Sequence, residues 1–235
     1  MKVVLSQRLQ ALADMVSDGN SVADVGCDHG FLSIYLVQNG ISPHVLAMDV
    51  RQGPLQRARE HIAEYELGNY IETRISDGLT AYRTGEAQTM VCAGMGGRLM
   101  MRILEESREK AQALSELILQ PQSELPAFRR FLRREGYTVL DENILCEEGK
   151  YYFLIKAVWT GEVQKETPML YDEFGEKLLT GRHPVLKEYL AYRIKTALQI
   201  ENELRLSEKD RARERLREIS EEMSMLREAM KFFAS

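Results

Sequence analysis

The fold is decided by residues 21–32, which read "SVADVGCDHGFL". The apolar start of this stretch predicts a buried strand over 21–25, and the residues after Gly30 predict the beginning of a helix. A strand that turns directly into a helix is the building unit of parallel α/β sheets, and its turn lies at the edge where such sheets bind ligands. An acid, Asp28, stands at the centre of this turn, and its presence there calls for an explanation.

Short apolar runs alternate with helical patterns from about residue 20 to residue 160, which is typical of an α/β fold. We predict strands at residues 21–25, 44–49, 71–76, 89–93, 116–120, 137–145 and 151–159, and helices near 30–39, 53–66, 97–112 and 123–135. The last two strands are separated only by residues 146–150, which favours an antiparallel hairpin. Five parallel strands followed by a hairpin fit the Rossmann-like seven-stranded sheet of the class I methyltransferases better than an all-parallel dinucleotide-binding sheet.

The pattern changes after Trp159, where a polar connection leads into a sequence that is helical to its end. We therefore divide the chain into an α/β domain over 1–160 and a helical domain over 161–235. Pro184 can begin a helix with apolar residues at coiled-coil spacing, residues 207–210 have the form of a capping box, and a second helix follows. The apolar register of the second helix does not continue that of the first, so we predict a coiled-coil-like antiparallel hairpin.

The composition of the 235 residues, 44% hydrophobic and 29% charged, is typical of a globular chain with one full-sized core and a smaller addition. The net charge of −5 means that any nucleic acid must meet a local basic face. The three cysteines are odd in number and far apart, which fits neither a disulfide framework nor a zinc site, so we expect no metal. No apolar run approaches the roughly 18 residues that cross a bilayer, and we expect a cytoplasmic protein without membrane contact.

The carboxylate in the first turn restricts the ligand that can bind there. Phosphate-binding turns of the G-x-G-x-x-G kind have glycine where Asp28 stands, and a carboxylate would repel a pyrophosphate. S-adenosylmethionine has no phosphate and carries a sulfonium and an ammonium cation, which an acid attracts. The turn therefore favours this cofactor over NAD, although an acid and a glycine after a strand are also an ordinary packing feature.

Two further acids follow the next two predicted strands. Asp49 ends the strand at 44–49, where an acid can accept both hydroxyls of a ribose, and Asp77 is placed to accept hydrogen bonds from an adenine amino group. Each of them alone is equally well explained as a helix cap or a turn residue. Together with Asp28 they describe a pocket for an adenosine with a positively charged tail.

The predicted strand at 89–93 runs into "CAGMGGRLM", residues 92–100, whose glycines let the backbone approach a ligand closely. This stretch lacks the [ND]-P-P-[YF] motif with which enzymes usually hold the exocyclic amine of adenine. A ring nitrogen needs less help, because its lone pair lies in the base plane and attacks without losing a proton. The product is a cation, and Asp28 is the candidate to stabilise it. His29 beside it is better explained as a structural residue than as a base.

The chain resembles the bacterial tRNA (adenine-22-N1)-methyltransferase family in "LSQRL" (5–9), "ADVGCDHGFL" (23–32), "AMDV" (47–50), "SDGL" (76–79), "CAGMGG" (92–97) and "LILQPQ" (117–122). The resemblance covers essentially the whole chain and implies a class I methyltransferase domain with a helical C-terminal domain, S-adenosylmethionine as cofactor, and Asp28 as the acid closest to methyl transfer. The cofactor contacts that it implies are Gly26, Cys27, Asp28, His29, Gly30, Asp49, Val50, Ser76, Asp77, Gly78, Ala93, Gly94, Met95 and Gly96. Gln122 departs from the family, in which many members have asparagine.

The partner that the resemblance implies is tRNA, and two stretches of this acidic chain are locally basic. One is "FRRFLRR" at 128–134, whose apolar residues Phe128, Phe131 and Leu132 are expected to pack on the sheet, and the other spans residues 205–217. A solvated charged face is the simpler explanation of the second. The candidates for RNA contact are Arg8, Gln120, Gln122, Arg129, Arg133, Lys209, Arg211, Arg213, Arg215 and Arg217. We expect a monomer, with a weak homodimer as the alternative.

The predicted function is methylation of N1 of an adenosine in tRNA, at position 22 if the resemblance holds. The target atom lies on the Watson–Crick edge, so the base must be unpaired or extruded. One alternative is a small-molecule methyltransferase, which would need a lid over its substrate. Another is an RNA-binding protein that retains the cofactor fold without turnover. Loss of the pocket acids would have favoured this alternative, but all three acids are present.

Overall fold

The computed structural model describes residues 2–163, 167–206 and 210–234, and the side chains of these residues except 210–212. They form two compact units, Met1–Lys165 and Glu166–Ser235. Within the described ranges, no helix is long and apolar enough to cross a membrane.

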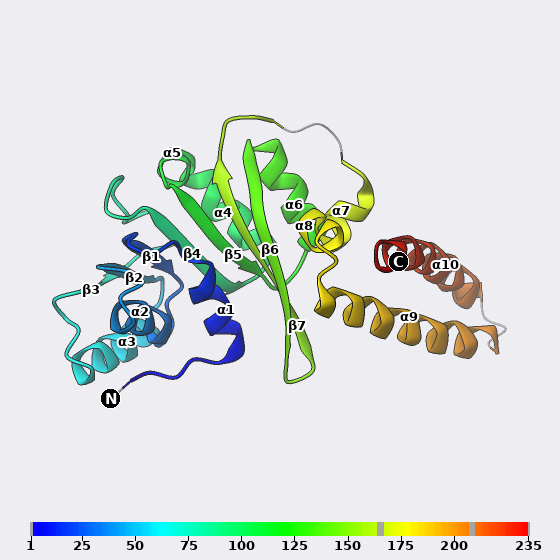
Figure 1. The fold of residues 1–235 in the computed structure, drawn as a ribbon, viewed down its shortest axis with the longest axis horizontal. Helices are drawn as coiled ribbons and strands as arrows, with labels where there is room; N and C mark the ends of the chain where they lie inside the picture. Colours follow the sequence, from blue (N-terminus) through cyan, green and yellow to red (C-terminus); the bar gives the residue numbers. More distant parts are fainter. Residues whose placement is uncertain (1, 164–166, 207–209, 235) are drawn as a thin grey trace. The chain divides into compact units, whose positions relative to one another are not determined.

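A seven-stranded sheet forms the centre of the first unit, in the order β3-β2-β1-β4-β5-β7-β6 (Figure 1). The strands are β1 Val22–Val25, β2 Val45–Asp49, β3 Ile71–Ile75, β4 Thr89–Met95, β5 Glu116–Pro121, β6 Tyr137–Glu147 and β7 Lys150–Trp159. Neighbouring strands among β1 to β5 pair in parallel, and β7 lies antiparallel to both β5 and β6. The predicted Rossmann-like seven-stranded sheet, in which five parallel strands are followed by an antiparallel β-hairpin, is therefore confirmed.

Helices cover both faces of the sheet, because alternate residues of a central strand point to opposite faces. The helices of one face are α1 Gln7–Met15, α2 Phe31–Gln38 and α3 Gln52–Glu64, and those of the other are α4 Gly97–Glu106, α5 Arg108–Gln112 and α6 Leu125–Arg134. In β4, Val91 packs in the core under α1 to α3, whereas Met90 and Cys92 pack in the core under α4 to α6. The helix predicted over 97–112 is wrong in one respect, since it is divided into two helices at Ser107.

An irregularity in β4 shapes the edge of the sheet where the parallel strands end. The pairing of β4 with β5 shifts between Ala93 and Met95, and Gly94 between them has a φ of 77°. Such a positive φ is open to glycine at little cost and strains most other residues. The shift lies at the carboxyl end of β4, and the residues around it, Ala93, Gly94 and Met95, line the site described below.

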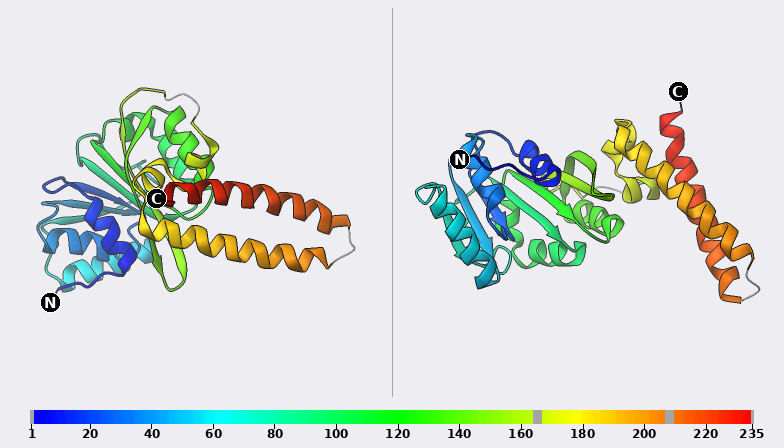
Figure 2. Two further views of the ribbon diagram at one scale, coloured as in Figure 1. Left: turned by 45° about the vertical axis from the view of Figure 1, so that its right-hand side comes forward. Right: turned by 90° about the horizontal axis from the view of Figure 1, so that it is seen from below.

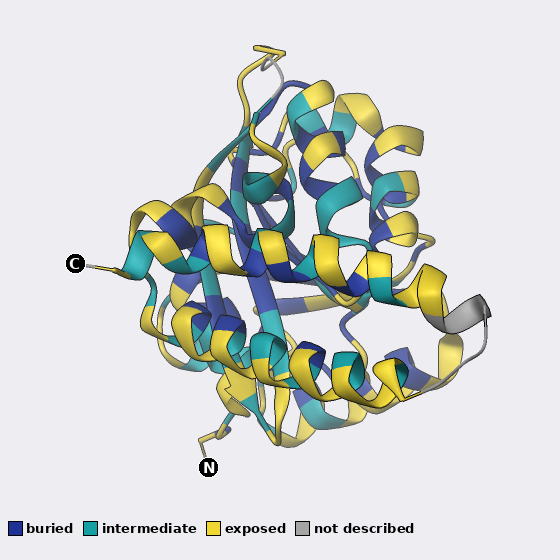
Figure 3. Ribbon diagram, turned by 90° about the vertical axis from the view of Figure 1, so that its right-hand side faces the viewer, coloured by how far each residue is buried: buried dark blue, intermediate teal, exposed yellow. Residues whose placement is uncertain are grey.

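The second unit is helical (Figure 2). Its elements are α7 Met169–Phe174, α8 Glu176–Thr180, α9 Pro184–Arg205, α10 Asp210–Met230 and the short 3₁₀ helix η1 Lys231–Phe233. The long helices α9 and α10 run antiparallel and pack through buried residues that include Leu190 and Leu226, and Arg193 of α9 pairs with Glu222 of α10. Buried and exposed residues alternate along both helices, as expected of an amphipathic pair (Figure 3). The predicted capping box includes residues 207–209, which lie outside the described residues, and coiled-coil packing stays a prediction.

Candidate active site

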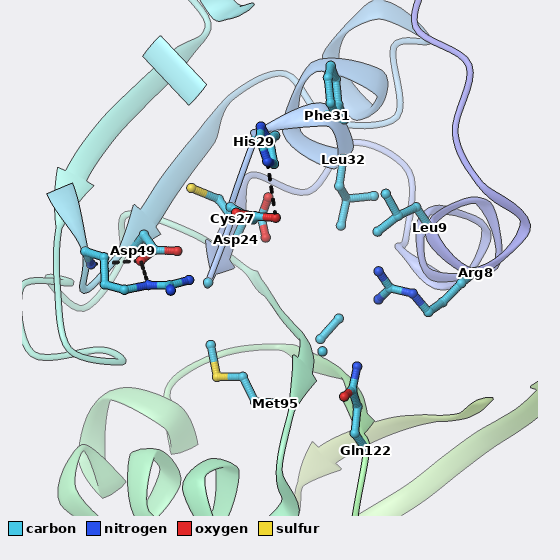
Figure 4. Close-up of a pocket in the computed structure, with 15 residues that line it drawn as sticks. Arg8, Leu9, Asp24, Cys27, His29, Phe31, Leu32, Asp49, Met95 and Gln122 are labelled. Atoms are coloured by element: carbon cyan, nitrogen blue, oxygen red, sulfur yellow. Dashed lines mark hydrogen bonds and ion pairs between the residues drawn. The ribbon is translucent and has the colours of Figure 1, made fainter. Parts of the chain in front are cut away.

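A cavity of about 370 Å³ lies at the carboxyl ends of β1 and β4 (Figure 4). It is lined by eight of the residues predicted to contact the cofactor: Gly26, Cys27, Asp28, His29, Asp49, Ala93, Gly94 and Met95. Two of the RNA candidates, Arg8 and Gln122, line it as well. The fold thus brings together, in one cavity, residues from the first turn, from β2, from β4 and from the segments around them. We call this cavity the first cavity.

A second cavity, of about 240 Å³, continues the first along the strand ends towards β3. Its lining includes four further predicted cofactor contacts, Val50, Ser76, Asp77 and Gly78. The two cavities share Gly26, Asp49, Arg51 and Met95, so they form one elongated trough. A trough across the ends of parallel strands is the place where open α/β sheets bind ligands.

Gly26 and Met95 meet where the two cavities join. Gly26 has a φ of 81°, and a Cβ atom at this position would lie 2.2 Å from the Cε methyl of Met95. A side chain at position 26 would therefore strain the backbone and force the end of the Met95 side chain to move.

The turn after β1 presents Asp28 to solvent at the mouth of the first cavity. Residue 28 has a φ of 48°, and its side chain is 61% exposed. His29 Nε2 lies 3.7 Å from Asp28 Oδ2. The His29 ring also stacks with the rings of Phe31 and His61, and the His29 carbonyl contacts His61 Nδ1 at 2.9 Å. These contacts hold the turn against Phe31 of α2 and His61 of α3. The structural role of His29 stays a prediction.

Asp24 is a pocket residue that we did not predict. It lies in β1, lines the first cavity and is almost fully buried, and the Ser33 hydroxyl donates a hydrogen bond of 2.6 Å to its Oδ2. Burial raises the pKa of Asp24 to about 6, the Ser33 hydrogen bond opposes this rise, and the charge of Asp49 adds to it. The available signal was an acid inside an otherwise apolar strand, because a buried acid costs free energy unless it is hydrogen-bonded or paired with a cation.

Asp49 and Asp77 occupy different environments. Asp49 is buried, and its Oδ1 accepts a hydrogen bond of 2.8 Å from the Arg51 backbone N–H. Asp77 is half-exposed and pairs with Arg102, whose Nη2 lies 3.0 Å from Asp77 Oδ1. The Asp77 carboxylate is therefore oriented by an arginine of α4, which the sequence alone does not connect with it.

Two of the predicted cofactor contacts, Gly30 and Gly96, line neither cavity. A Cβ atom at Gly30 would lie 3.1 Å from the Cβ of Ala58, and one at Gly96 would lie 3.2 Å from the Ser123 hydroxyl. Their small size allows close packing of the two turns against neighbouring segments.

Two of the predicted RNA contacts have buried side chains, which argues against a direct contact with RNA. Gln120 is 1% exposed, and Arg129 is 3% exposed. The Arg129 Nε donates to Glu142 Oε1 at 2.8 Å, and the pair lies in the protein interior. No sequence pattern indicates that Glu142 is the partner, because it lies on a different element.

The remaining RNA candidates lie in two places. Arg133 is partly exposed on α6, and Arg213, Arg215 and Arg217 are exposed on α10. Lys209 and the side chain of Arg211 lie outside the described residues. Across the ranges that the structure covers, no group of His, Cys, Asp and Glu residues could hold a metal ion.

Comparison with known proteins connects this geometry to an activity. Residues 5–155 match the family described as "Methyltransferase domain". The tRNA (adenine(22)-N(1))-methyltransferase of Bacillus subtilis is 37% identical over 153 residues, which are 65% of this chain and 64% of that protein. The alignment therefore spans a little less than two thirds of that relative.

Solved structures extend the likeness to the whole chain. Sp1610 of Streptococcus pneumoniae, in complex with S-adenosyl-L-methionine, matches with a TM-score of 0.84 and 30% identity over 97% of this chain and 100% of that one. TrmK of M. capricolum, in complex with S-adenosyl-homocysteine, matches with a TM-score of 0.82 and 25% identity over 98% of this chain and 99% of that one.

Proposed function

Since the chain belongs to the methyltransferase-domain family and, within it, to the tRNA (adenine-22-N1)-methyltransferases, we propose that it transfers the methyl group of S-adenosylmethionine to N1 of adenosine 22 in tRNA. The observation that carries the proposal is the trough formed by the two cavities, whose lining includes four acids, Asp24, Asp28, Asp49 and Asp77, and two arginines, Arg8 and Arg51. The excess of acids favours a cationic ligand and disfavours a phosphate-bearing one.

The residues of the trough fit this cofactor. The second cavity, with Ser76, Asp77 and Gly78, would hold the adenine, and Asp49 at the junction would accept from the ribose. Asp24 and Asp28 line the first cavity, where they would attract the ammonium and sulfonium groups. The cofactor, when bound, supplies an activated methyl group.

The acceptor base would enter the first cavity from its open side. Gln122 lines this cavity, and its amide oxygen can accept a hydrogen bond from the N6 amino group of adenine, which leaves the N1 lone pair free. No residue has to remove a proton, because N1 attacks through an in-plane lone pair. The protein's part is to hold the extruded base in line for transfer and to stabilise the positive charge with Asp28.

The tRNA would also contact the helical unit. Arg213, Arg215 and Arg217 are exposed on α10, and arginine side chains bind phosphates through their planar guanidinium groups. We further propose that the protein is a cytoplasmic monomer, in keeping with a substrate that is itself soluble in the cytoplasm.

Transfer of a labelled methyl group tests the proposal. The protein is incubated with labelled S-adenosylmethionine and either bulk unmodified tRNA or free adenosine, and the label in each is measured. We expect label in tRNA alone, and a large loss with Asp49→Ala because cofactor binding is weakened by roughly 1–3 kcal/mol. Label in free adenosine at the same rate would instead indicate a small-molecule methyltransferase.

A further inference from the structure

An exposed phenylalanine stands at the rim of the first cavity. All seven phenylalanines of the chain lie within the described ranges, and Phe31, at 37% exposed, is the only exposed one. It begins α2 and lines the first cavity, and Figure 4 shows it with His29 on the side of the cavity away from Gln122. An exposed phenylalanine forgoes the stabilisation that burial would give, so its ring surface is open to a ligand that enters here.

The Phe31 ring belongs to a cluster of three nearly parallel rings, which we call the ring cluster. The other two rings are His29 of the first turn and His61 of α3. The ring centres of Phe31 and His61 lie 4.6 Å apart with 21° between the ring planes, and those of Phe31 and His29 lie 6.0 Å apart with 11° between the planes. Nucleobases stack on flat rings of this kind, and the contact is largely independent of which base it is.

The backbone around the ring cluster holds the three rings in place. Gly30 packs closely against Ala58, which lies one turn before His61 on the same face of α3. His61 Nδ1 lies 2.9 Å from the His29 carbonyl oxygen, and it is the donor, because a carbonyl oxygen only accepts. The rings are therefore ordered before a ligand arrives, which lowers the entropy cost of stacking on them.

The place of the ring cluster indicates which base it meets. If the target adenine lies in the first cavity near Asp28 and Gln122, the next nucleotide of the strand lies at the rim of that cavity. Extrusion of the target takes away one stacking partner of this neighbouring base. An aromatic surface at the rim replaces the lost stacking, so extrusion costs less free energy.

We propose that the ring cluster stacks on the nucleobase next to the target adenosine and so holds the RNA strand while the target is extruded. This inference rests on the proposed function and adds to it an RNA contact on the first unit. A phosphate is the competing occupant, and the Asp28 carboxylate, with Oδ2 3.7 Å from His29 Nε2, disfavours it.

Binding of tRNA to the full chain in the presence of S-adenosylhomocysteine tests the inference without any turnover. Phe31→Leu keeps an apolar side chain and removes the flat ring, whereas Phe31→Tyr keeps the ring. Four transcripts are compared: the intact one, and three that lack only the base of the target nucleotide, of its 5′ neighbour or of its 3′ neighbour.

We expect Phe31→Leu to weaken binding of the intact transcript roughly fivefold or more, and Phe31→Tyr to weaken it less than about twofold. The loss caused by Phe31→Leu should shrink to less than about twofold on one of the two transcripts that lack a neighbouring base, because no base is left there to stack. His61→Asn, which removes a ring and keeps a donor for the His29 carbonyl, should show the same pattern with a smaller loss.

Tyr70→Leu is the matched control. Tyr70 is 51% exposed and directly precedes β3, so it lies at the edge of the sheet opposite the strand ends that form the trough. This variant should bind all four transcripts as the original protein does.

Unchanged binding of the intact transcript by Phe31→Leu overturns the inference. An equal loss on all four transcripts also overturns it, because Phe31 would then act only by holding the turn. A loss that disappears only without the target base assigns Phe31 to that base and overturns the proposed contact with its neighbour. Failure of the unsubstituted protein to bind and methylate the intact transcript overturns the proposed function as well.

Discussion

The Asp28 side chain is largely exposed to water, and water screens its charge in the isolated protein. A base seated over the first cavity would displace part of this water, which strengthens the interaction between the carboxylate and a developing positive charge. The backbone at residue 28 has a φ of 48°, which asparagine adopts as readily as aspartate. Exchange of Asp28 for asparagine thus removes the charge and leaves the turn in place.

Asp28→Asn should lower the turnover number more than it weakens cofactor binding, because the charge matters most when the methylated base becomes a cation. Single-turnover methylation of tRNA and calorimetry with S-adenosylhomocysteine measure the two effects. Equal losses in both would make Asp28 a binding residue, and full activity would refute its electrostatic role.

Asp24 gives a prediction in which stability and affinity change in opposite directions. Its pKa rises from 3.8 to about 6 on folding because it is buried, so the folded protein holds a proton that the unfolded chain releases. The contribution of Asp24 to stability should therefore fall as pH rises from about 4 to about 6, by on the order of 3 kcal/mol. A cationic ligand beside Asp24 would recover part of this loss by favouring the charged carboxylate.

Asp24→Asn should raise the melting temperature of the ligand-free protein at pH 7 and flatten its pH dependence, because the buried charge is removed. The same variant should bind S-adenosylhomocysteine more weakly, because the ammonium group loses a partner. Thermal melts between pH 4 and 7, with and without the ligand, check both effects. A lower melting temperature at pH 7 without ligand would contradict this account.

At the scale of elements, the strands could be predicted to within two residues at either end because each is a short apolar run between turn residues. The division between α4 and α5 at Ser107 could not be predicted from the sequence, because the apolar positions of the two helices continue one helical pattern. The burial of Arg129 could not be predicted for a different reason. Its partner Glu142 lies on β6, and the aromatic ring beside it, Phe153, lies on β7, so only the folded sheet brings the three together.

Arg129→Met should destabilise the protein by about 3–5 kcal/mol, because it removes the cation that pairs with the buried carboxylate of Glu142. The double variant Arg129→Met/Glu142→Leu should recover most of this loss, since no unpaired charge remains. Urea unfolding of the three proteins measures the free energies. If Arg129→Met keeps full stability and loses tRNA affinity instead, Arg129 would have to be assigned to RNA binding after all.

At the scale of the whole molecule, every residue that lines the trough lies in the first unit. Thr160 and Gly161 donate backbone hydrogen bonds to the Gly136 carbonyl, so a truncation that preserves the sheet has to retain them. A chain cut after residue 163 should therefore bind S-adenosylhomocysteine as the full chain does, but should bind and methylate tRNA poorly. Calorimetry and a tRNA methylation assay on the truncated protein check the two expectations.

Reversal of charge in the full chain separates RNA binding from folding. Arg213→Glu with Arg217→Glu should imitate the truncation, and the salt dependence of tRNA binding should become shallower by roughly one unit for each phosphate that the variant no longer neutralises. Wild-type affinity with an unaltered salt slope would assign α10 to folding or self-association.

The central claim is methylation of N1 of one adenosine in tRNA, and the most direct measurement identifies the modified nucleoside and its position. An unmodified tRNA transcript and its A22→G twin are incubated with the protein and S-adenosylmethionine, digested, and analysed by mass spectrometry, with reverse-transcription stops mapping the site. The account predicts N1-methyladenosine and a stop at position 22 in the first transcript and neither in its twin. Equal methylation of both transcripts, or a different methylated nucleoside, would contradict it.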